Sequence, residues 1–424
     1  MKRLSWSGSV SESAVLAVGA VRDNPARSGL AITGIVIGIV TVVLVATVLA
    51  NVRNQIALLF RELGTDNVFA FHLTGDPYQP ASDEEARRLP LKREFAAQVA
   101  RDAPAVREVA AQIIVPNVIN GRALTARAGS NVSDTVLVEG ASANFFDVVG
   151  AEFAHGRPFT ELEERAGARV AVIGGNLARA LFGPGAGEAV LGREVRLAGD
   201  PYRVVGVLAP RRGGFFGENR QDSVMSIAAG AIERRFPEAD ATVLYLRAEP
   251  GQIRAAASQG QMVLRRLRQL GPDEEDDFNL STSEQIIGTF DSVGAGIAAA
   301  TVGLAAVSLL IGGIGIANVM VISVTERTRE IGVRLAVGAR RAEVQRQFLI
   351  EAARLSLAGV IAGLLVAAVV TALLTLVLPG FLPVLPAWAV AFGLVSSCLT
   401  GIFAGYLPAR RAAAMDPVEA LRHA

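Results

Sequence analysis

Four stretches of the chain contain no Asp, Glu, Lys or Arg for twenty or more residues. A helix of 23 residues, the length of the first stretch (30–52), is about 34 Å long and crosses the hydrocarbon core of a bilayer, which is about 30 Å thick. The second stretch (293–325) has 33 residues, so its helix must tilt or extend beyond the bilayer. The pattern predicts four transmembrane helices, at residues 30–52, 291–325, 348–378 and 387–407.

The first apolar stretch raises the alternative of a cleaved signal peptide, because Val48-Leu49-Ala50 is similar to a small-residue cleavage site. The apolar region is longer than a signal core of about 7–15 residues, and 29 residues precede it. We therefore expect a retained membrane anchor.

Charge is distributed unevenly about these spans. Residues 51–292 contain 27 Lys and Arg against 32 Asp and Glu, a net charge of −5, whereas the rest of the chain contains 14 against 8, a net charge of +6. The excess of Arg beside the span ends follows the positive-inside rule. We therefore predict that the N-terminal segment 1–29, the connection 326–347 and the tail 408–424 are cytoplasmic. The long segment 53–290 and the short connection 379–386 are then outside the cytoplasm.

Glycines recur in the spans, mostly at a spacing of four residues. Small residues at this spacing allow helix backbones to approach closely in lipid. Glycine is also simply frequent in membrane helices, which is an alternative reading of any single pair. The predicted helix-packing residues are Gly34, Gly38, Gly312, Gly313, Gly315, Gly359, Gly363, Gly401 and Gly405.

The segment between the first and second spans is predicted to be a large α+β domain. Strand candidates at Val109–Val118 and Ala241–Leu246 alternate with helix candidates at Lys92–Arg101 and Gln252–Leu270. The middle contains short strand candidates punctuated by glycine, such as Val190–Gly192. We predict a base formed by about 61–140 and 235–285, which carries an inserted, mostly β lobe at about 141–234.

Composition limits the chemistry of the chain. Hydrophobic residues make up 51%, charged residues 19%, and the mean hydropathy is +0.40, whereas soluble domains are about 25% charged. The single cysteine, Cys398, excludes a disulfide framework, and the three histidines have no metal-ligand spacing. The chain has no Gly-x-x-x-x-Gly-Lys phosphate loop and no Gly-x-Ser-x-Gly motif. We therefore expect no catalytic, cofactor or metal site in this chain and no nucleic-acid partner.

Two further segments of the outer domain are candidate ligand or partner sites. Residues 273–277 are five acids in a row, but they lack the alternation and central glycine of a calcium loop, so we expect a solvated loop. Residues 213–217, Gly-Gly-Phe-Phe-Gly, are expected to form a mobile loop whose apolar tip touches a partner.

The connection between the second and third spans is the most informative polar segment. Ile331 and Leu335 share one face of a predicted helix, Glu330 and Arg334 form an i,i+4 pair on another face, and Gly338 suits a helix stop. Two functions fit a short charged helix at the inner membrane surface. It is an interfacial anchor, or it is a lever through which a partner moves both attached spans.

Four segments of the chain resemble one family. The strongest runs over residues 308–356 and includes GIGIANVMVISVTERTREIGVRLAVGARR. The others are residues 401–422 (GIFAGYLPARRAAAMDPVEALR), residues 27–67 with GIVIGI and LGTDN, and residues 145–208 with FFDVVGAEFAHGRPFT and VAVIGGNLARALFG. With these motifs the chain resembles the MacB/FtsX-like ABC permeases, the type VII ABC membrane subunits. The outer segment is similar to the MacB periplasmic core domain.

The resemblance implies a mechanism. Such permeases dimerise and transmit the ATP-driven closure of an ATPase dimer to the outer domain through long second spans, and no substrate passes between the spans. By resemblance, the segment 326–340 is the coupling helix that docks on the ATPase. The implied ATPase-coupling residues are Glu326, Arg327, Thr328, Arg329, Glu330, Arg334, Gly338 and Arg340.

The resemblance also implies partners. This sequence differs from fused MacB in lacking a nucleotide-binding domain, so a separate ABC ATPase subunit is expected to bind ATP and Mg, and the chain itself is expected to be no enzyme. The other implied partners are a second permease copy, identical or similar, the lipid bilayer, and a periplasmic adaptor with an outer-membrane channel.

The expected function is that of the permease of an export system in the bacterial cytoplasmic membrane. A small molecule, a peptide or a lipid-like compound fits as its substrate. Two alternatives remain open at this point. One is a lipoprotein-releasing permease, and the other is an FtsX-like signalling protein that controls an outer cell-wall hydrolase.

Overall fold

The computed structural model describes residues 25–62, 64, 66–74, 80–119, 121–185, 187–210, 220–378 and 380–422 of the 424-residue chain. Most of the predicted N-terminal segment 1–29 and the whole of the 213–217 loop lie outside these residues. The described residues form two compact units. One is formed by the described parts of 1–52 and 292–424, and the other by those of 53–291.

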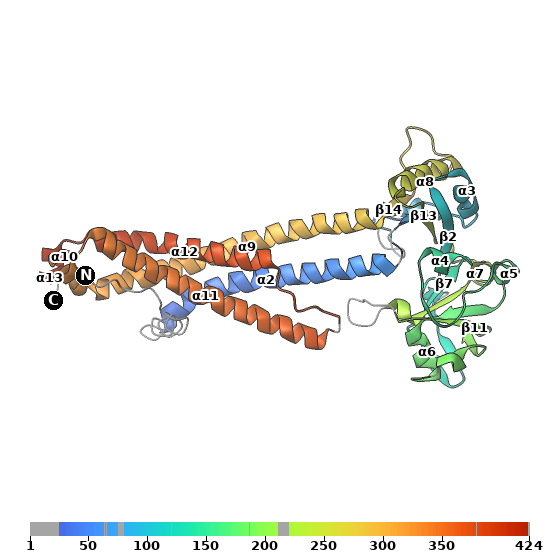
Figure 1. The fold of residues 1–424 in the computed structure, drawn as a ribbon, viewed down its shortest axis with the longest axis horizontal. Coiled ribbons are helices and arrows are strands. Elements are labelled where there is room, and N and C mark those ends of the chain that lie inside the picture. The colour runs from blue at the N-terminus through green and yellow to red at the C-terminus, as the bar shows by residue number, and fades with distance from the viewer. Residues whose placement is uncertain are drawn as a thin grey trace. The chain divides into compact units, whose positions relative to one another are not determined.

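The first unit is built on four long helices, labelled in Figure 1. They are α2 (Pro25–Glu62), α9 (Ser283–Glu326), α11 (Arg341–Val377) and α12 (Ala387–Ala413). All four are long and apolar enough to cross a membrane. Each contains one of the predicted spans, except that α11 ends one residue before the predicted end at 378. The predicted fold class, four membrane helices with a large mixed α/β domain, is confirmed.

The glycines of α2 lie where this helix meets α9. A Cβ atom built on Gly34 would lie 2.9 Å from the Cα and the N of Gly312, and one built on Gly38 would lie 3.3 Å from the carbonyl oxygen of Ala305. Contacts this short leave no room for a side chain at Gly34. Two glycines that face each other therefore allow the two backbones to touch, as in small-residue packing between membrane helices.

The glycines of α11 and α12 serve the other helix pairs. A Cβ on Gly359 would meet Ile35, and a Cβ on Gly363 would meet Ile39, each at 3.0 Å. On α12, the corresponding contacts of Gly401 and Gly405 are with Ser356 and Ala352 of α11. Gly313 of α9 faces Thr400 of α12 at 3.0 Å, whereas Gly315 is half-buried.

The fourth helix continues beyond the predicted span 387–407. Pro408 lies inside α12, which ends at Ala413. A proline inside a helix removes one hydrogen bond and costs about 3 kcal/mol. Pro408, Ala409 and Ala412 are all buried, and the two alanines belong to the apolar core of the helical unit. We attribute the continuation of the helix to this packing.

A buried amide fixes the connection between α11 and α12. The side chain of Asn51, 5% exposed, donates from Nδ2 to the carbonyl oxygen of Leu382 at 3.1 Å and accepts from the Leu382 amide at Oδ1 at 2.7 Å. Nδ2 also donates to the carbonyl of Thr47, one turn earlier in α2, at 3.0 Å. The polar group at the end of the first span is thereby satisfied, and the connection is held against α2.

One mixed sheet runs through the second unit. Its strands lie in the order β14, β1, β13, β2, β7, β12, β9, β11, β10, β5, β6, and β8 pairs with β11. The β7–β12 and β9–β11 pairs are parallel and the others are antiparallel. A separate hairpin is formed by β3 and β4. The bounds are β1 Asn67–Phe71, β2 Val106–Ile114, β3 Val118–Ile119, β4 Arg122–Ala123, β5 Ala126–Ala128, β6 Asn131–Ser133, β7 Leu137–Ala141, β8 Phe153–Gly156, β9 Val170–Ile173, β10 Glu194–Leu197, β11 Asp200–Leu208, β12 Val224–Ala228, β13 Thr242–Ala248 and β14 Asn279–Thr282.

The base of this unit has its own core. Helices α3 (Phe95–Asp102) and α8 (Ile253–Leu267) pack on β1, β2, β13 and β14 through apolar side chains such as Val99, Leu244, Leu246 and Leu264. Both helices lie within the predicted ranges Lys92–Arg101 and Gln252–Leu270, apart from Asp102. The predicted strand Val109–Val118 begins and ends earlier, at Val106 and Ile114.

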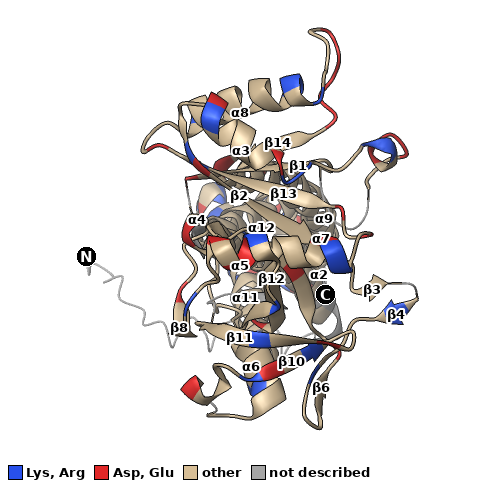
Figure 2. Ribbon diagram, turned by 90° about the vertical axis from the view of Figure 1, so that its right-hand side faces the viewer, with Lys and Arg blue, Asp and Glu red and all other residues tan. Residues whose placement is uncertain are grey.

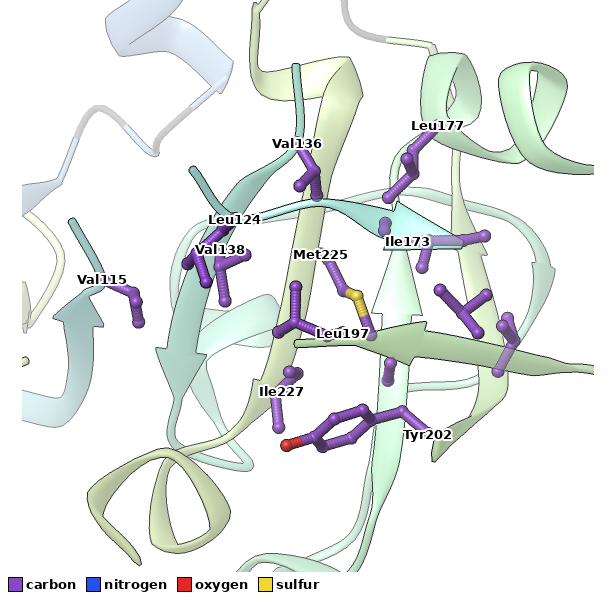
Figure 3. Packing of buried hydrophobic residues seen from close by; sticks show 14 of the residues in the cluster. Val115, Leu124, Val136, Val138, Ile173, Leu177, Leu197, Tyr202, Met225 and Ile227 are labelled. Atoms are coloured by element: carbon purple, nitrogen blue, oxygen red, sulfur yellow. The ribbon is translucent and has the colours of Figure 1, made fainter. Parts of the chain in front are cut away.

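The core of the lobe draws in residues beyond the predicted bounds 141–234. It includes Val115, Leu124 and Val138 beside Met225 and Leu197, so much of 115–140 packs with the lobe (Figure 3). Besides its strands, the lobe contains the helices α4 (Phe145–Val148), α5 (Glu161–Ala166), α6 (Gly175–Phe182) and α7 (Ala229–Arg235), and the 3₁₀ turns η2 (Gly187–Val190) and η3 (Arg220–Ser223). A further 3₁₀ turn, η1 (Glu85–Arg87), lies between β1 and α3.

Two physical reasons explain these differences. Between residues 118 and 133 the strands have two or three residues each, too short for alternation to reveal their inner face. The predicted strand at Val190–Gly192 overlaps the η2 turn instead, because Gly192 adopts a positive φ of 78°.

An arginine joins the base to the lobe. Arg93, just before α3, donates from Nε and Nη2 to the two carboxylate oxygens of Glu233 on α7, at 2.7 and 3.1 Å. Its Nη1 donates to Glu164 on α5 at 3.0 Å, and the other oxygen of Glu164 accepts from the Ala143 amide at 2.7 Å. Helices α5 and α7 lie side by side in Figure 2. The hydrogen bonds to Glu233 raise the pKa of Arg93, so the guanidinium stays charged.

Candidate functional site

The segment between the second and third spans folds as a short helix, α10 (Thr328–Ala336). Its end is formed by Gly338, whose φ of 98° is a left-handed conformation suited to glycine. The Gly338 amide donates to the Leu335 carbonyl at 3.1 Å, and the Ala339 amide donates to the Arg334 carbonyl at 3.0 Å. The following helix, α11, starts at Arg341, and the Arg340 amide donates to the carboxylate of Glu343 at 3.1 Å.

Charged side chains hold α10 to α11. Arg334 pairs with Glu330 within α10 and donates to Gln347 of α11 at 2.8 Å. Arg327, just before α10, lies 3.4 Å from the Glu351 carboxylate. Three of the predicted coupling residues, Arg327, Glu330 and Arg334, therefore take part in intramolecular contacts that orient the helix.

The remaining predicted residues divide into two groups. Thr328 is half-buried and donates from Oγ1 to the Thr325 carbonyl at 2.8 Å, so its side chain stabilises the end of α9. Glu326, Arg329 and Arg340 are exposed, and we find no ion pair for their side chains within the described part of the chain. These three are free to contact a partner.

The apolar residues of α10 also divide by face. Ile331 is 2% exposed and, with Leu335, packs in the core of the helical unit, as their shared face predicts. Val333 and Val337 point away from it and are 46% and 84% exposed. The segment therefore exposes two apolar side chains together with charged ones that have no ion pair among the described residues.

The chain's last described helix, α13 (Pro417–Arg422), packs against α10, and the two lie at the same end of the helical unit in Figure 1. A Cβ built on Gly332 would lie 2.6 Å from the Cβ of Ala420, which is 3% exposed. Sequence reasoning missed Gly332, Ala420 and α13. The helix start was readable, because Asp416 followed by Pro417 is a common N-cap and N1 combination. The contact between Ala420 and Gly332 could not be predicted, because no pattern in either segment indicates that the two segments pack together.

The titratable groups of the outer domain stabilise the fold. Burial lowers the pKa of His72, which is 7% exposed and lies near Asp240, Arg268, Arg88 and Glu85. Hydrogen bonds from Thr74 and from the Ala81 amide lower the pKa of Glu85. Across the described residues, no group of three His, Cys, Asp or Glu is arranged to hold a metal ion.

The acidic run 273–277 is only partly a solvated loop. Most of this connection is red in Figure 2. Asp276 and Asp277 are half-buried, and they pair with Arg265 of α8 and with Arg268, the residue that follows α8. The other three acids are exposed. Two of the five acids therefore stabilise the end of α8, and among the described residues the run forms no metal-binding group.

Comparison with known protein families decides the identity of the chain. Residues 28–260 match the family described as MacB-like periplasmic core domain, and residues 302–417 match the FtsX-like permease C-terminal family. The chain is a MacB/FtsX-like ABC permease. The second match contains α10 and most of α9, α11 and α12, so the candidate site of this permease lies inside the FtsX-like region.

Curated relatives of this permease carry export functions in their names. The macrolide export ATP-binding/permease protein MacB of Hahella chejuensis is 31% identical over 420 residues, which cover 99% of this chain and 61% of that protein. The pyoverdine export ATP-binding/permease protein PvdT of Pseudomonas putida is 32% identical and is covered to 60%. The chain thus spans about three fifths of the length of these relatives.

Solved structures of outer domains are similar as well. The periplasmic region of MacB from Actinobacillus actinomycetemcomitans aligns with 17% identity and a TM-score of 0.43, over 55% of this chain and 95% of that one. The extracellular domain of the transporter YknZ aligns with 20% identity and a TM-score of 0.38, over 51% of this chain and 99% of that one.

Proposed function

We propose that this chain is the membrane subunit of an ABC exporter, and that it transmits movement from an ATP-binding subunit in the cytoplasm to its outer domain. The substrate moved by the outer domain is a small molecule, a peptide or a lipid-like compound. The chain itself hydrolyses no ATP in this proposal. ATP and Mg are bound by the partner subunit, which docks on α10.

The single observation that carries the proposal is the continuity of α9. This helix begins directly after β14 of the outer domain and ends at Glu326, two residues before α10. Its 44 residues correspond to about 66 Å, roughly twice the thickness of the hydrocarbon core. In this proposal, a displacement at α10 is passed along this continuous helix toward β14.

The composition of the spans supports transmission rather than conduction. No Asp, Glu, Lys, Arg or His occurs in residues 30–52, 293–325, 355–378 or 387–407. Carriers and pumps place such groups in the membrane as binding or relay sites. The glycine contacts of α2, α9, α11 and α12 describe a closely packed bundle, which suits a mechanical role.

The surface of α10 supports docking of a partner. Arg329 on α10, Glu326 at the end of α9 and Arg340 just before α11 have no ion-pair partners among the described residues, and Val333 and Val337 are exposed. The contacts of Arg327 and Arg334 with α11 hold this helix in place. Force on α10 is then transferred to α9 and α11 together.

Export is favoured over the two alternative functions by the outer domain. It belongs to the MacB-like periplasmic core family, and the relatives described above are named as exporters of macrolides and of pyoverdine. We further propose that the permease acts as a dimer in the cytoplasmic membrane, with both termini inside the cell. An adaptor protein and an outer-membrane channel complete the system in this proposal.

The test is to reconstitute the permease in lipid nanodiscs with its ATP-binding subunit, identified by co-purification. We expect the complex to hydrolyse ATP faster than the ATP-binding subunit alone. Replacing Arg329 with Ala should reduce this stimulation roughly tenfold, because a charged contact at an interface is worth about 1.5–3 kcal/mol.

The matched control is Arg165→Ala on α5 of the outer domain, where the side chain is 78% exposed. This variant removes the same charge far from α10 in sequence and should leave the stimulation unchanged. Equal stimulation by wild type and by both variants would count against docking through Arg329. ATP hydrolysis by the purified permease alone would overturn the proposal as a whole.

A further inference from the structure

The close contact between α10 and α13 has no role in the function proposed so far. Gly332 is buried, and a methyl group in its place would lie 2.6 Å from the Cβ of Ala420 and 3.6 Å from the Pro417 carbonyl oxygen. Real Cβ atoms do not approach one another to 2.6 Å, so Ala420 occupies the space that a side chain at Gly332 would need. The methyl group of Ala420 therefore packs directly against the backbone of Gly332.

The path from α13 back to the fourth span is short and fixed. Only Ala414, Met415 and Asp416 separate α12 from α13. The Ala414 amide donates to the Arg410 carbonyl at 3.1 Å, and Met415 packs against the core of the helical unit. The Asp416 carboxylate accepts from the Val418 amide at 2.8 Å and caps α13. The connection therefore has little freedom to absorb a displacement of α13.

We infer that Ala420 is a positioning residue for the coupling helix, and that α13 links α10 to the fourth span. The inference rests on the proposed function and extends it. A partner that moves α10 then moves three spans. The chain itself attaches α10 to α9 and α11, and the Gly332–Ala420 contact attaches it to α12. Without that contact, α10 would still bind the partner but would be attached directly to two spans only, and its movement would reach α12 only through the packing of α12 on α9 and α11.

The test uses hydrogen exchange of the full permease in nanodiscs, with no partner present. Gly332→Ala should push α13 away, so that exchange accelerates in peptides covering both 328–336 and 417–422. The double variant Gly332→Ala/Ala420→Gly removes the second methyl group and should restore slow exchange. Gly303→Ala is the control, because a Cβ there meets nothing within 4 Å.

A second variant, Ala420→Val, tests the same contact in case Gly332→Ala fails to fold. Ala420→Val adds bulk toward Gly332 from the side of α13, which lies outside the four span helices. It should accelerate exchange in the same two regions. If exchange in 328–336 is unchanged by both Gly332→Ala and Ala420→Val, the inference is overturned, whatever the partner does.

Coupling is then measured with the ATP-binding subunit. We expect Gly332→Ala to bind it with unchanged affinity, to lose roughly tenfold in stimulated hydrolysis, and to recover in the double variant. Equal stimulation in all variants would contradict the positioning role. A wild-type permease that neither binds nor stimulates the subunit would refute the proposed function instead, and the exchange result would still decide whether α13 holds α10.

Discussion

At the scale of single residues, Glu163 at the start of α5 has the strongest local electrostatic environment that the structure describes. Its carboxylate accepts two hydrogen bonds from the Arg157 guanidinium at 2.8 and 2.9 Å, and one from the Thr160 amide at 2.8 Å. Thr160 in turn caps the Glu163 amide, which completes a capping box. These bonds, first of all those from Arg157, lower the pKa of Glu163 from 4.5 to about 2.

This pKa predicts how acid affects the lobe. Because the folded state binds the proton more weakly than the unfolded state, the stabilisation by Glu163 is complete above about pH 4.5 and is lost as the pH falls toward 2. Glu163→Gln should cost about 1 kcal/mol at pH 7, and this cost should shrink as the pH falls toward 2, where about half of Glu163 is protonated in the folded state. Local hydrogen exchange of 160–167 in the full permease, at several pH values, measures the difference.

The control for this prediction is Glu161→Gln. Glu161 pairs with Arg165, but both side chains are about three quarters exposed, so its removal should change little at any pH. If Glu163→Gln and wild type lose protection over the same pH range, the ion pair does not stabilise α5.

The residue scale also shows what sequence can and cannot supply. The Thr160-x-x-Glu163 spacing is a readable capping box, although the sequence analysis did not use it. The triple contact of Arg93 with Glu164 and Glu233 was not readable, because its members lie far apart in the chain. Long-range ion pairs leave no local pattern.

At the scale of elements, the contact between α2 and α9 depends on Gly34. Gly34→Leu should force the two helices apart, since its Cβ alone would lie 2.9 Å from the Gly312 backbone. Overpacking of this kind costs about 1–3 kcal/mol. We expect a lower midpoint for unfolding of the permease in mixed detergent micelles, followed by circular dichroism.

Gly303→Leu provides the matched control on α9 itself, because the space around Gly303 is open. It adds the same side chain to a membrane helix and should leave the unfolding midpoint where it is. Equal destabilisation by the two substitutions would mean that added bulk, rather than the contact with Gly312, is responsible.

Element identity was readable wherever apolar runs were long. The four spans were predicted from charge-free stretches longer than those usual in helices of soluble proteins. Helices α3 and α8 and strand β13 were predicted from hydrophobic periodicity, and their observed bounds are close to the predicted ones. Hydrophobic periodicity did not predict the short elements. The strands between 118 and 133 have two or three residues each, and α12 passes through Pro408 because tertiary packing outweighs the local preference of proline.

At the scale of the whole molecule, the proposed topology is open to direct labelling. In a Cys398→Ser background, Arg165→Cys on the outer domain should react with a membrane-impermeant maleimide added to intact cells, and Val337→Cys beside α10 should not. Both original side chains are highly exposed, 78% and 84%, so access is limited by the membrane and not by burial.

Opening the cells supplies the control, since both cysteines should then react. Labelling of Val337→Cys in intact cells would contradict the positive-inside prediction and would place α10 on the wrong side for an ATP-binding partner.

The family motifs revealed more at this scale than physical reasoning could. The segment from Ser308 to Ser356 identified the permease, whereas α10 alone, read physically, was equally compatible with an interfacial anchor. The docking of α13 on α10 escaped both approaches, because it depends on the fit of Ala420 against a glycine in a different segment. Substrate choice has no signature in the residues discussed here.

The unbroken course of α9 also constrains how the chain can change in length. Each residue of an α-helix turns by about 100° and rises about 1.5 Å. One inserted amino acid would rotate β14 by more than a quarter turn about the helix axis with respect to Glu326, whereas seven would add about 10 Å and leave a rotational offset of only about 20°. Insertions or deletions in this helix should therefore be tolerated when they preserve the rotation of β14 about the helix axis. A change of seven residues should be far less harmful than a change of one.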